Sequence, residues 1–489
     1  MLFKFEYYKA DIVRAVLELV KDGFYIFLAS FIIFFGLSCN RLLLFLGSIF
    51  LFASGAFASY ALYFFKARPT EQMLRTMFEN DIAESYEMLS IKLIIWILLS
   101  IAICLGILLY YTKEKLQPRV LTTLCLMLFV YNIYHPHYKI LNAYFPIQYL
   151  HNGYLYISSK FHVIHKLDIS EKFDFVSKAD DDLVGVLVIG ESARFDHFSI
   201  NGYNRETTPT LAQTPNLFSF KAEAAANLTY LSVPYMLTRV TKNHLAEAEN
   251  ETTVLSVLTK LGFNTGLIGT QTILKYLKNH NNHTIYDEVN ISIIPGGSAL
   301  YQMNAYDEVM LPYFNNFLHT GGKEFIVLHT SGSHWNYTAR YPSQYAKFKP
   351  TCSSHAKIDQ RSCTKEELIN SYDNSIFYTD HILSQVIDML KNKNAFLIYV
   401  SDHGESLGEN GVYAHGSDLT PEQLTIPFIF WASDKFFTDH SGLKQNLARL
   451  QKSKKELTHD YVFHSILDCA KIQSSIIDPE LSLCNQRKP

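Results

Sequence analysis

Three long stretches without a charged residue constrain the fold of this chain most. Residues 23–40, 42–65 and 93–112 contain no Asp, Glu, Lys or Arg. As a helix, each stretch is long enough to cross the roughly 30 Å of hydrocarbon in a bilayer. The sequence therefore predicts a membrane protein with at least three spanning helices.

A fourth span is expected from Val120 to about Tyr138, because it brings the rest of the chain to a defined side of the membrane. Its strongly apolar core is shorter than those of the other three. We expect a transmembrane domain of about four helices over residues 1–138, a linker over 139–180 and a second domain over 181–489.

The loop charges predict an orientation. Arg41 lies between the first two spans, and Lys113, Lys115 and Arg119 follow the third. Because cytoplasmic loops retain Lys and Arg, both loops are expected in the cytoplasm, with the amino terminus and the second domain outside. The alternative is a cytoplasmic amino terminus with a different number of spans.

The connection over 66–90 has Met73, Met77, Ile82 and Tyr86 at helical spacing among charged residues. This pattern predicts an amphipathic helix. Two interpretations stay open: a helix that lies on the membrane interface and guides a lipid headgroup, or a solvated connecting helix.

The cysteines agree with an exported second domain. Cys352 with Cys363, and Cys469 with Cys484, form two locally spaced pairs, and the other three cysteines fall in or beside the spans. We therefore expect two disulfides in an oxidising compartment. A net charge of −3 argues against nucleic acid as a partner.

Strand-like apolar runs alternate with helical patterns after residue 181. This alternation predicts an α/β domain with a mainly parallel sheet and helices on both faces. One such helix is expected over Ser371 to Leu390. The predicted strands are Leu183–Ile189, Thr265–Ile268, Phe325–Leu328, Ala395–Val400 and Ile426–Trp431.

Chemically capable side chains follow three of these runs. Glu191 comes after the first, His329 and His334 end or follow the third, and Asp402, His403, Glu405 and His415 follow the fourth. Parallel sheets gather ligands at the carboxyl ends of their strands, so we expect these groups to share one edge.

Glu191, Asp402 and His403 could coordinate a metal ion and leave room for a hydroxyl ligand. Zinc suits this mixture of oxygen and nitrogen donors. The sequence offers the hydroxyls of Ser192 and Thr229. A serine-esterase interpretation is poor, because the segment after Gly190 lacks the second glycine of a nucleophile elbow.

The motifs together resemble the lipid A phosphoethanolamine transferases, the family that includes the mobile colistin-resistance enzymes. The resemblance runs from about residue 40 to the end and implies an alkaline-phosphatase-like, sulfatase-like second domain. The segments that carry it are Gly190–Arg194, Asn201–Tyr203, Arg205–Pro209, Gly332–His334, Arg340–Pro342, Asn370–Asn374, Tyr378–Asp380 and Ser401–Gly416.

The resemblance also implies roles for residues. Zinc would be held by Glu191, Thr229, Asp402 and His403, with Thr229 as the nucleophile. His334 and His415 match histidines that hold the substrate phosphate and act in catalysis.

Three further residues are implied as substrate contacts. His329 and Glu405 are weaker candidates for substrate binding than His334 and His415. Glu84 matches an interfacial glutamate that contacts the lipid substrate.

The implied activity is transfer of phosphoethanolamine from phosphatidylethanolamine to lipid A or lipooligosaccharide through phospho-Thr229, in a ping-pong mechanism. This activity underlies polymyxin resistance. The implied location is the inner membrane of a Gram-negative bacterium, multi-pass, with the catalytic domain in the periplasm; we expect a monomer.

The chain departs from the family pattern at several places. Ala225 and Tyr235 replace cysteines that flank the nucleophile, Thr76 replaces an asparagine, and a cysteine-bracketed lysine loop is not recognisable around 271–283. We also expect four spans, where the family usually has five with an additional first span. These departures leave another periplasmic acceptor possible.

Three other functions compete with this one. One is transfer of glycerol phosphate from phosphatidylglycerol with the same groups. A sulfatase is disfavoured because no Cys-x-Pro-x-Arg segment occurs. A membrane sensor with a degenerate catalytic domain would have lost its ligands, yet the implied Glu, Thr, Asp and His are present.

Overall fold

The computed structural model describes residues 12–38, 40–65, 91–111, 127, 147–159, 166–271, 285–293, 305–353, 363–416 and 419–485. These residues form two compact units, one up to residue 159 and one from residue 166 onward. The 66–90 helix with Glu84 and the span expected after Val120 lie outside the described residues, except for residue 127.

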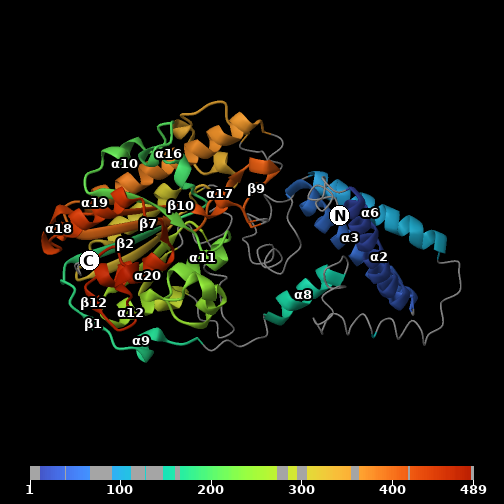
Figure 1. Ribbon diagram of the computed structural model, residues 1–489, viewed down its shortest axis with the longest axis horizontal. Coiled ribbons are helices and arrows are strands. Elements are labelled where there is room, and N and C mark those ends of the chain that lie inside the picture. Colours follow the sequence, from blue (N-terminus) through green and yellow to red (C-terminus); the bar gives the residue numbers. More distant parts are fainter. Residues whose placement is uncertain are drawn as a thin grey trace. The chain divides into compact units, whose positions relative to one another are not determined.

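The described residues of the first unit form four helices: α2 (Ile12–Leu37), α3 (Arg41–Phe65), α6 (Ile91–Tyr111) and α8 (Ile147–Ser159) (Figure 1). Three helices in the described part are long and apolar enough to span a membrane, with spans at Val20–Leu37, Arg41–Tyr60 and Ile91–Leu109. This finding confirms the three spans predicted from the charge-free stretches. Two hydrogen bonds join α3 and α6, from Trp96 Nε1 to Ser59 Oγ at 3.0 Å and from Ser100 Oγ to Phe52 O at 3.0 Å.

The second unit is built on an eight-stranded sheet in the order β11-β3-β10-β7-β2-β6-β4-β5. Only β10 is antiparallel to its neighbours β3 and β7, so the sheet is mainly parallel, as predicted. The strands are β2 (Leu183–Gly190), β3 (Leu217–Glu223), β4 (Asn264–Gly269), β5 (Ile291–Ile293), β6 (Glu324–His329), β7 (Asn394–Ser401), β10 (Thr425–Ala432) and β11 (Leu457–Thr458). All five predicted strands are present.

Alternating side chains of β2 fill two hydrophobic cores, one on each face of the sheet. Val184, Val186 and Val188 pack on one face, and Leu183 and Leu187 on the other. Burial of both faces explains why β2 reads as a continuous apolar run.

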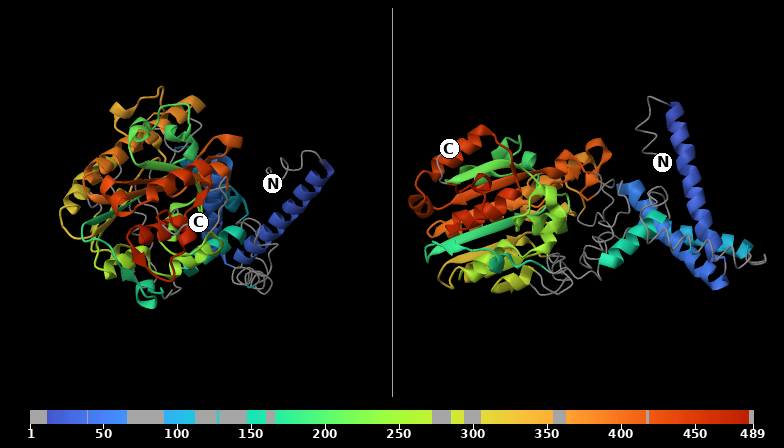
Figure 2. Two further views of the ribbon diagram at one scale, coloured as in Figure 1. Left: turned by 60° about the vertical axis from the view of Figure 1, so that its left-hand side comes forward. Right: turned by 60° about the horizontal axis from the view of Figure 1, so that its bottom comes forward.

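Helices cover both faces (Figure 2). The core that contains the valines also includes residues of α10 (Pro209–Gln213), α15 (Leu311–Phe317) and α16 (Lys365–Leu390). The core on the other face includes residues of α11 (Thr229–Met236), α12 (Val254–Lys260), α18 (Asp434–Asp439), α19 (Leu443–Ser453) and α20 (Asp460–Cys469). Shorter elements are α9 (Ile169–Lys172), α17 (Pro421–Leu424) and the strand pairs β1 (Val176–Ser177) with β12 (Ile472–Gln473) and β8 (Ser406–Leu407) with β9 (Tyr413–Ala414).

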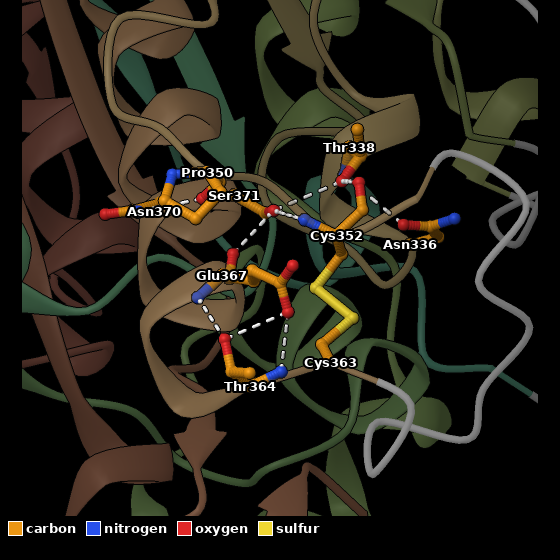
Figure 3. Close-up of a disulfide and its surroundings, with 9 residues drawn as sticks. All are labelled: Asn336, Thr338, Pro350, Cys352, Cys363, Thr364, Glu367, Asn370 and Ser371. Carbon is orange, nitrogen blue, oxygen red and sulfur yellow. Dashed lines mark hydrogen bonds between the residues drawn. A yellow bond between two sulfur atoms is a disulfide. The ribbon is translucent and has the colours of Figure 1, made fainter.

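Both expected disulfides are present, Cys352–Cys363 and Cys469–Cys484. The first joins the chain after β6 to the start of α16 (Figure 3). There Thr364 Oγ1 accepts from Glu367 N at 3.2 Å, and Glu367 Oε2 accepts from Thr364 N at 2.7 Å, a capping box that starts the helix. The region expected as a linker contains α8, α9 and β1; the boundaries at 138 and 180 stay predictions.

Candidate active site

The carboxyl ends of three adjacent parallel strands bring the polar residues together. In register, Gly190 of β2 pairs with Ser401 of β7, and Ile189 of β2 pairs with His329 of β6. Glu191 leaves β2 directly beside Asp402 and His403, which leave β7. The Asp402 amide donates to Gly190 O at 3.0 Å, which fixes the spacing of the two strand ends.

Glu191, Asp402 and His403 form a cluster with no solvent exposure. His403 Nε2 lies 3.6 Å from Glu191 Oε1 and 3.3 Å from Asp402 Oδ2. The other ring nitrogen, Nδ1, lies 2.9 Å from the Gly404 carbonyl, which can only accept, so Nδ1 carries the proton and Nε2 presents a lone pair to both carboxylates.

Thr229 completes this cluster from the opposite side. It is the first residue of α11, and its Oγ1 lies 3.1 Å from Glu191 Oε2 and 3.3 Å from His403 Nε2. Burial of the side chain is almost complete, at 6% exposure. The structure therefore brings together all four residues that the sequence predicted as metal ligands.

Burial and mutual repulsion set the charges in the cluster. Burial raises the pKa of Asp402 well above its usual range, and the Glu191 carboxylate raises it further. Burial also acts to raise the pKa of Glu191, but His403, His334 and His415 outweigh it and hold that pKa low. Two buried carboxylates this close require a proton or a cation between them.

The donor set fits a metal cation. One ligand atom from each of Glu191, Asp402 and His403 lies within 4.8 Å of the others. Asp402 Oδ2 is buried and accepts no hydrogen bond from the described residues. Burial lowers the pKa of His403 to about 4, so its imidazole is neutral and can bind a metal near pH 7. A cation here would be bound by Asp402 Oδ2 and by the lone pair of His403 Nε2.

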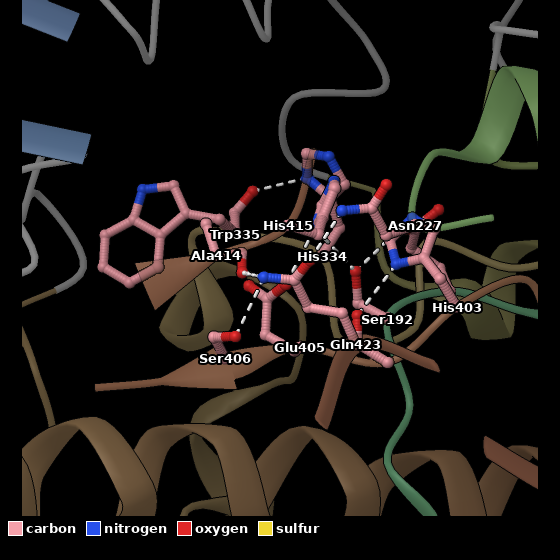
Figure 4. A network of polar contacts seen from close by, with 12 residues as sticks. Ser192, Asn227, His334, Trp335, His403, Glu405, Ser406, Ala414, His415 and Gln423 are labelled. Carbon is pink, nitrogen blue, oxygen red and sulfur yellow. Dashed lines mark hydrogen bonds and ion pairs between the residues drawn. The ribbon is translucent and has the colours of Figure 1, made fainter. Parts of the chain in front are cut away.

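A second group of polar side chains borders the cluster. His415 Nδ1 lies 2.7 Å from Glu405 Oε2, and Tyr337 donates to Glu405 Oε1 at 2.6 Å. The ring centroids of His403 and His415 are 4.1 Å apart, and those of His334 and His415 are 5.8 Å apart (Figure 4). The structure thus places His334, His415 and Glu405 beside the cluster of Glu191, Asp402 and His403.

Burial also tunes this second group. It lowers the pKa of His415 to about 4 and raises that of Glu405 to about 7. Glu191, His334 and His415 could also hold a metal ion, since one ligand atom from each lies within 4.8 Å of the others.

Two other candidate residues occupy different settings. His329 is fully buried, and neither ring nitrogen has a hydrogen-bond partner among the described residues. Ser192 is also fully buried, and its Oγ donates to Glu191 Oε1 at 2.6 Å. Thr229 differs from Ser192 in that its Oγ1 also lies 3.3 Å from Nε2 of His403, a second candidate metal ligand.

Two residues that make hydrogen bonds to the site were not predicted from the sequence. Gln271 Nε2 donates to Glu191 Oε2 at 2.8 Å; it follows β4 closely, so the strand-end rule could have found it. Asp307 accepts from the amides of Ser331 at 2.7 Å and Gly332 at 3.0 Å, which shapes the loop before His334. No nearby strand pattern signals Asp307.

The fold and the site define an alkaline-phosphatase-like protein with candidate membrane-spanning helices. Residues 184–472 match the family model for sulfatases, which is more than half of the 489 residues, so the chain belongs to the sulfatase family. Residues 26–161 match a second model, described as phosphoethanolamine transferase EptA/EptB. This match confirms the resemblance drawn from the motifs.

Relatives with known names agree. The chain is 36% identical over 310 residues to the Kdo(2)-lipid A phosphoethanolamine 7''-transferase of Salmonella typhimurium, covering 61% of this chain and 54% of that protein. The chain thus spans about half the length of this curated relative.

Two solved structures are similar. One is the integral membrane lipooligosaccharide phosphoethanolamine transferase A of Neisseria meningitidis, with a TM-score of 0.74, 24% identity and coverage of 91% of this chain and 88% of that chain. The other is the periplasmic domain of EptC from Escherichia coli in complex with Zn, with a TM-score of 0.54, 25% identity and coverage of 65% and 90%.

Proposed function

We propose that this protein is a zinc-dependent phosphoethanolamine transferase. The donor is phosphatidylethanolamine, and the acceptor is lipid A or lipooligosaccharide. The enzyme acts as a monomer in the inner membrane of a Gram-negative bacterium, with its second domain in the periplasm. The relatives at 36% identity and the EptA/EptB match support this assignment.

One observation carries the proposal. The Thr229 hydroxyl lies 3.1 Å from a carboxylate oxygen of Glu191 and 3.3 Å from His403 Nε2. A hydroxyl that close to two candidate ligands would be activated as a nucleophile by a bound metal ion. The neighbouring His334 and His415 would hold the oxygens of a phosphoryl group.

Glu191, Asp402, His403 and Thr229 would hold the zinc ion. When bound, zinc stabilises negative charge on oxygen, which makes the hydroxyl proton easier to lose. The Glu191 carboxylate accepts the Thr229 hydroxyl hydrogen and aligns the oxygen.

The reaction has two balanced halves. In the first, Thr229 Oγ loses its proton and attacks phosphorus, the bond from phosphorus to the diacylglycerol oxygen breaks, and that oxygen takes up one proton. In the second, an acceptor oxygen loses its proton and attacks the phosphorus of phospho-Thr229, the bond to Oγ breaks, and the threonine oxygen takes up one proton. His334 would donate the proton to the leaving diacylglycerol, because the lowered pKa of His415 leaves that imidazole neutral near pH 7.

The contact of Glu84 with the lipid substrate stays a prediction. A role for His329 in substrate binding is likewise a proposal, which rests on its place at the end of β6, beside β2 and the Glu191 that follows β2.

The test is the intact mass of zinc-loaded protein after incubation with phosphatidylethanolamine in detergent. Wild type should gain one phosphoethanolamine group, and Thr229→Ala should gain none. Thr229→Ala removes one hydroxyl and no large packing group, so the fold should remain. A glycerol phosphate adduct formed only with phosphatidylglycerol would replace the proposed donor, and an adduct that persists in Thr229→Ala would exclude Thr229 as the nucleophile.

A further inference from the structure

The nucleophile segment is joined to the His415 hairpin through one buried amide. Gln423, in α17, has no solvent exposure. Its Oε1 accepts from Asn227 Nδ2 at 2.6 Å, and Asn227 lies two residues before Thr229. Its Nε2 donates to Ser406 Oγ at 2.9 Å and to Ala414 O at 3.0 Å (Figure 4).

Ser406 and Ala414 are paired residues of the β8–β9 hairpin, and His415 follows Ala414 directly. Ala414 has a φ of 59°, a left-handed conformation that is costly for a residue with a side chain. A conformation of this kind persists only where surrounding contacts hold it. The hydrogen bond from Gln423 to the Ala414 carbonyl is such a contact, at the peptide that positions His415.

The backbone of α17 adds two contacts. Gln423 O accepts from Gly404 N at 2.8 Å, immediately after His403, and Leu424 O accepts from Ala224 N at 2.8 Å. A Cβ at Gly404 would lie 2.2 Å from Glu422 O, so the close approach of α17 requires glycine there. One short helix therefore touches the chain beside His403, before Thr229 and across the hairpin.

The two segments that Gln423 joins also pack directly. A Cβ at Gly416 would lie 2.8 Å from Leu228 Cδ2, and Leu228 precedes Thr229.

We propose that Gln423 is a positioning residue that fixes the spacing between the Thr229 nucleophile and the phosphate-binding His415. The inference rests on the proposed roles of Thr229 and His415. In-line transfer needs the nucleophile and the phosphoryl group at a defined separation, and an error of about 1 Å can cost roughly 100-fold in rate. A single planar amide that binds both segments sets that separation.

Three substitutions separate the two halves of the link. Asn227→Leu removes the bond to the nucleophile segment. Gln423→Glu keeps an acceptor for Asn227 but loses the donor to Ala414 O. Gln423→Met removes both halves at similar volume. Gln451→Glu, on the exposed side of α19, is the matched control for an added charge.

The measurement is the single-turnover rate of adduct formation by zinc-loaded, full-length protein over a range of phosphatidylethanolamine concentrations. Asn227→Leu should lower the maximal rate ~10-fold with little change in the concentration for half-maximal rate. Gln423→Glu should also raise that concentration, because His415 holds the donor phosphate. Adding Asn227→Leu to Gln423→Met should cost nothing more, since the shared link is already absent.

The outcomes are distinguishable. Wild-type rates in Asn227→Leu and Gln423→Glu, or additive losses in the double variant, would overturn the positioning role while the proposed function stands. If wild type forms no adduct, the proposed function itself fails. Should Gln423→Met not fold, the different effects of the two single variants on rate and half-maximal concentration still decide the question.

Discussion

The two edges of the same sheet treat buried charge differently. At the carboxyl-terminal edge, one ligand atom from each of Glu191, Asp402 and His403 lies within 4.8 Å of the others. All three side chains are fully buried, and none of the three is a lysine or arginine. At the amino-terminal edge, Asp182 pairs with Lys435 and Asp180 with Lys471, and all four side chains are at least 27% exposed. The first edge is arranged to bind a ligand, and the second only to keep its charges solvated and paired.

The comparison predicts that variants at the carboxyl-terminal edge change activity much more than stability, whereas variants at the opposite edge do the reverse. The largest effect is expected for Glu191→Gln. It removes the charge that faces His403 Nε2 and should lower the transfer rate about 1,000-fold or more. The measurement is transfer from phosphatidylethanolamine, with circular dichroism to check the fold. Less than tenfold loss would mean that Glu191 is not a ligand.

His415→Asn and His334→Asn sharpen the division within the catalytic edge. Each should lower transfer about 100-fold, because we propose that these groups hold the substrate or assist proton transfer to it. Both should keep bound zinc at the wild-type level, which elemental analysis can measure. Loss of zinc in His415→Asn would instead place that histidine among the essential ligands.

At the opposite end of the unit, the disulfide Cys469–Cys484 joins α20 to the carboxyl-terminal segment (Figure 1). It closes a loop with a sequence separation of 15. Replacing both cysteines with alanine should lower the free energy of unfolding by ~3 kcal/mol, measured in urea. Transfer per folded molecule should stay the same; a parallel loss of transfer would show that the two ends are coupled.

The smallest effect concerns pH. Burial lowers the pKa of His440, whose ring stacks on Phe436 at 4.0 Å. A lowered folded pKa means that the unfolded state binds the proton more readily, so stability is lost as pH falls below the unfolded value of about 6.5. His440→Phe should make melting temperature less dependent on pH between about 7.5 and 5.5. An unchanged pH dependence would assign it to other groups, such as the buried His464.

The sequence predicted the parts of this molecule that repeat or follow simple rules. Apolar runs marked β2, β4, β6, β7 and β10, and the strand-end rule marked Glu191, Asp402 and His403. β3 was not predicted, because Leu217–Glu223 alternates apolar and polar residues and the exposed Lys221 interrupts the apolar run.

Contacts between residues far apart in the sequence could not be predicted from the spacing of residues along the chain. Asn227 and Gln423 are 196 residues apart, and nothing near either one indicates the other. The role of Thr229 came only from the family resemblance, since the lone hydroxyl is far in sequence from both strand ends. Contacts of this kind depend on how α11 and α17 pack, which local patterns do not determine.

We expect a metal ion to bind at the carboxyl-terminal edge of the sheet and not at the amino-terminal edge. The most direct test compares zinc bound to purified wild type, Asp402→Asn and the matched Asp182→Asn, measured by elemental analysis and by titration after chelation. Wild type and Asp182→Asn should bind zinc tightly, and Asp402→Asn should bind it weakly or not at all. Equal zinc binding in all three proteins would contradict it.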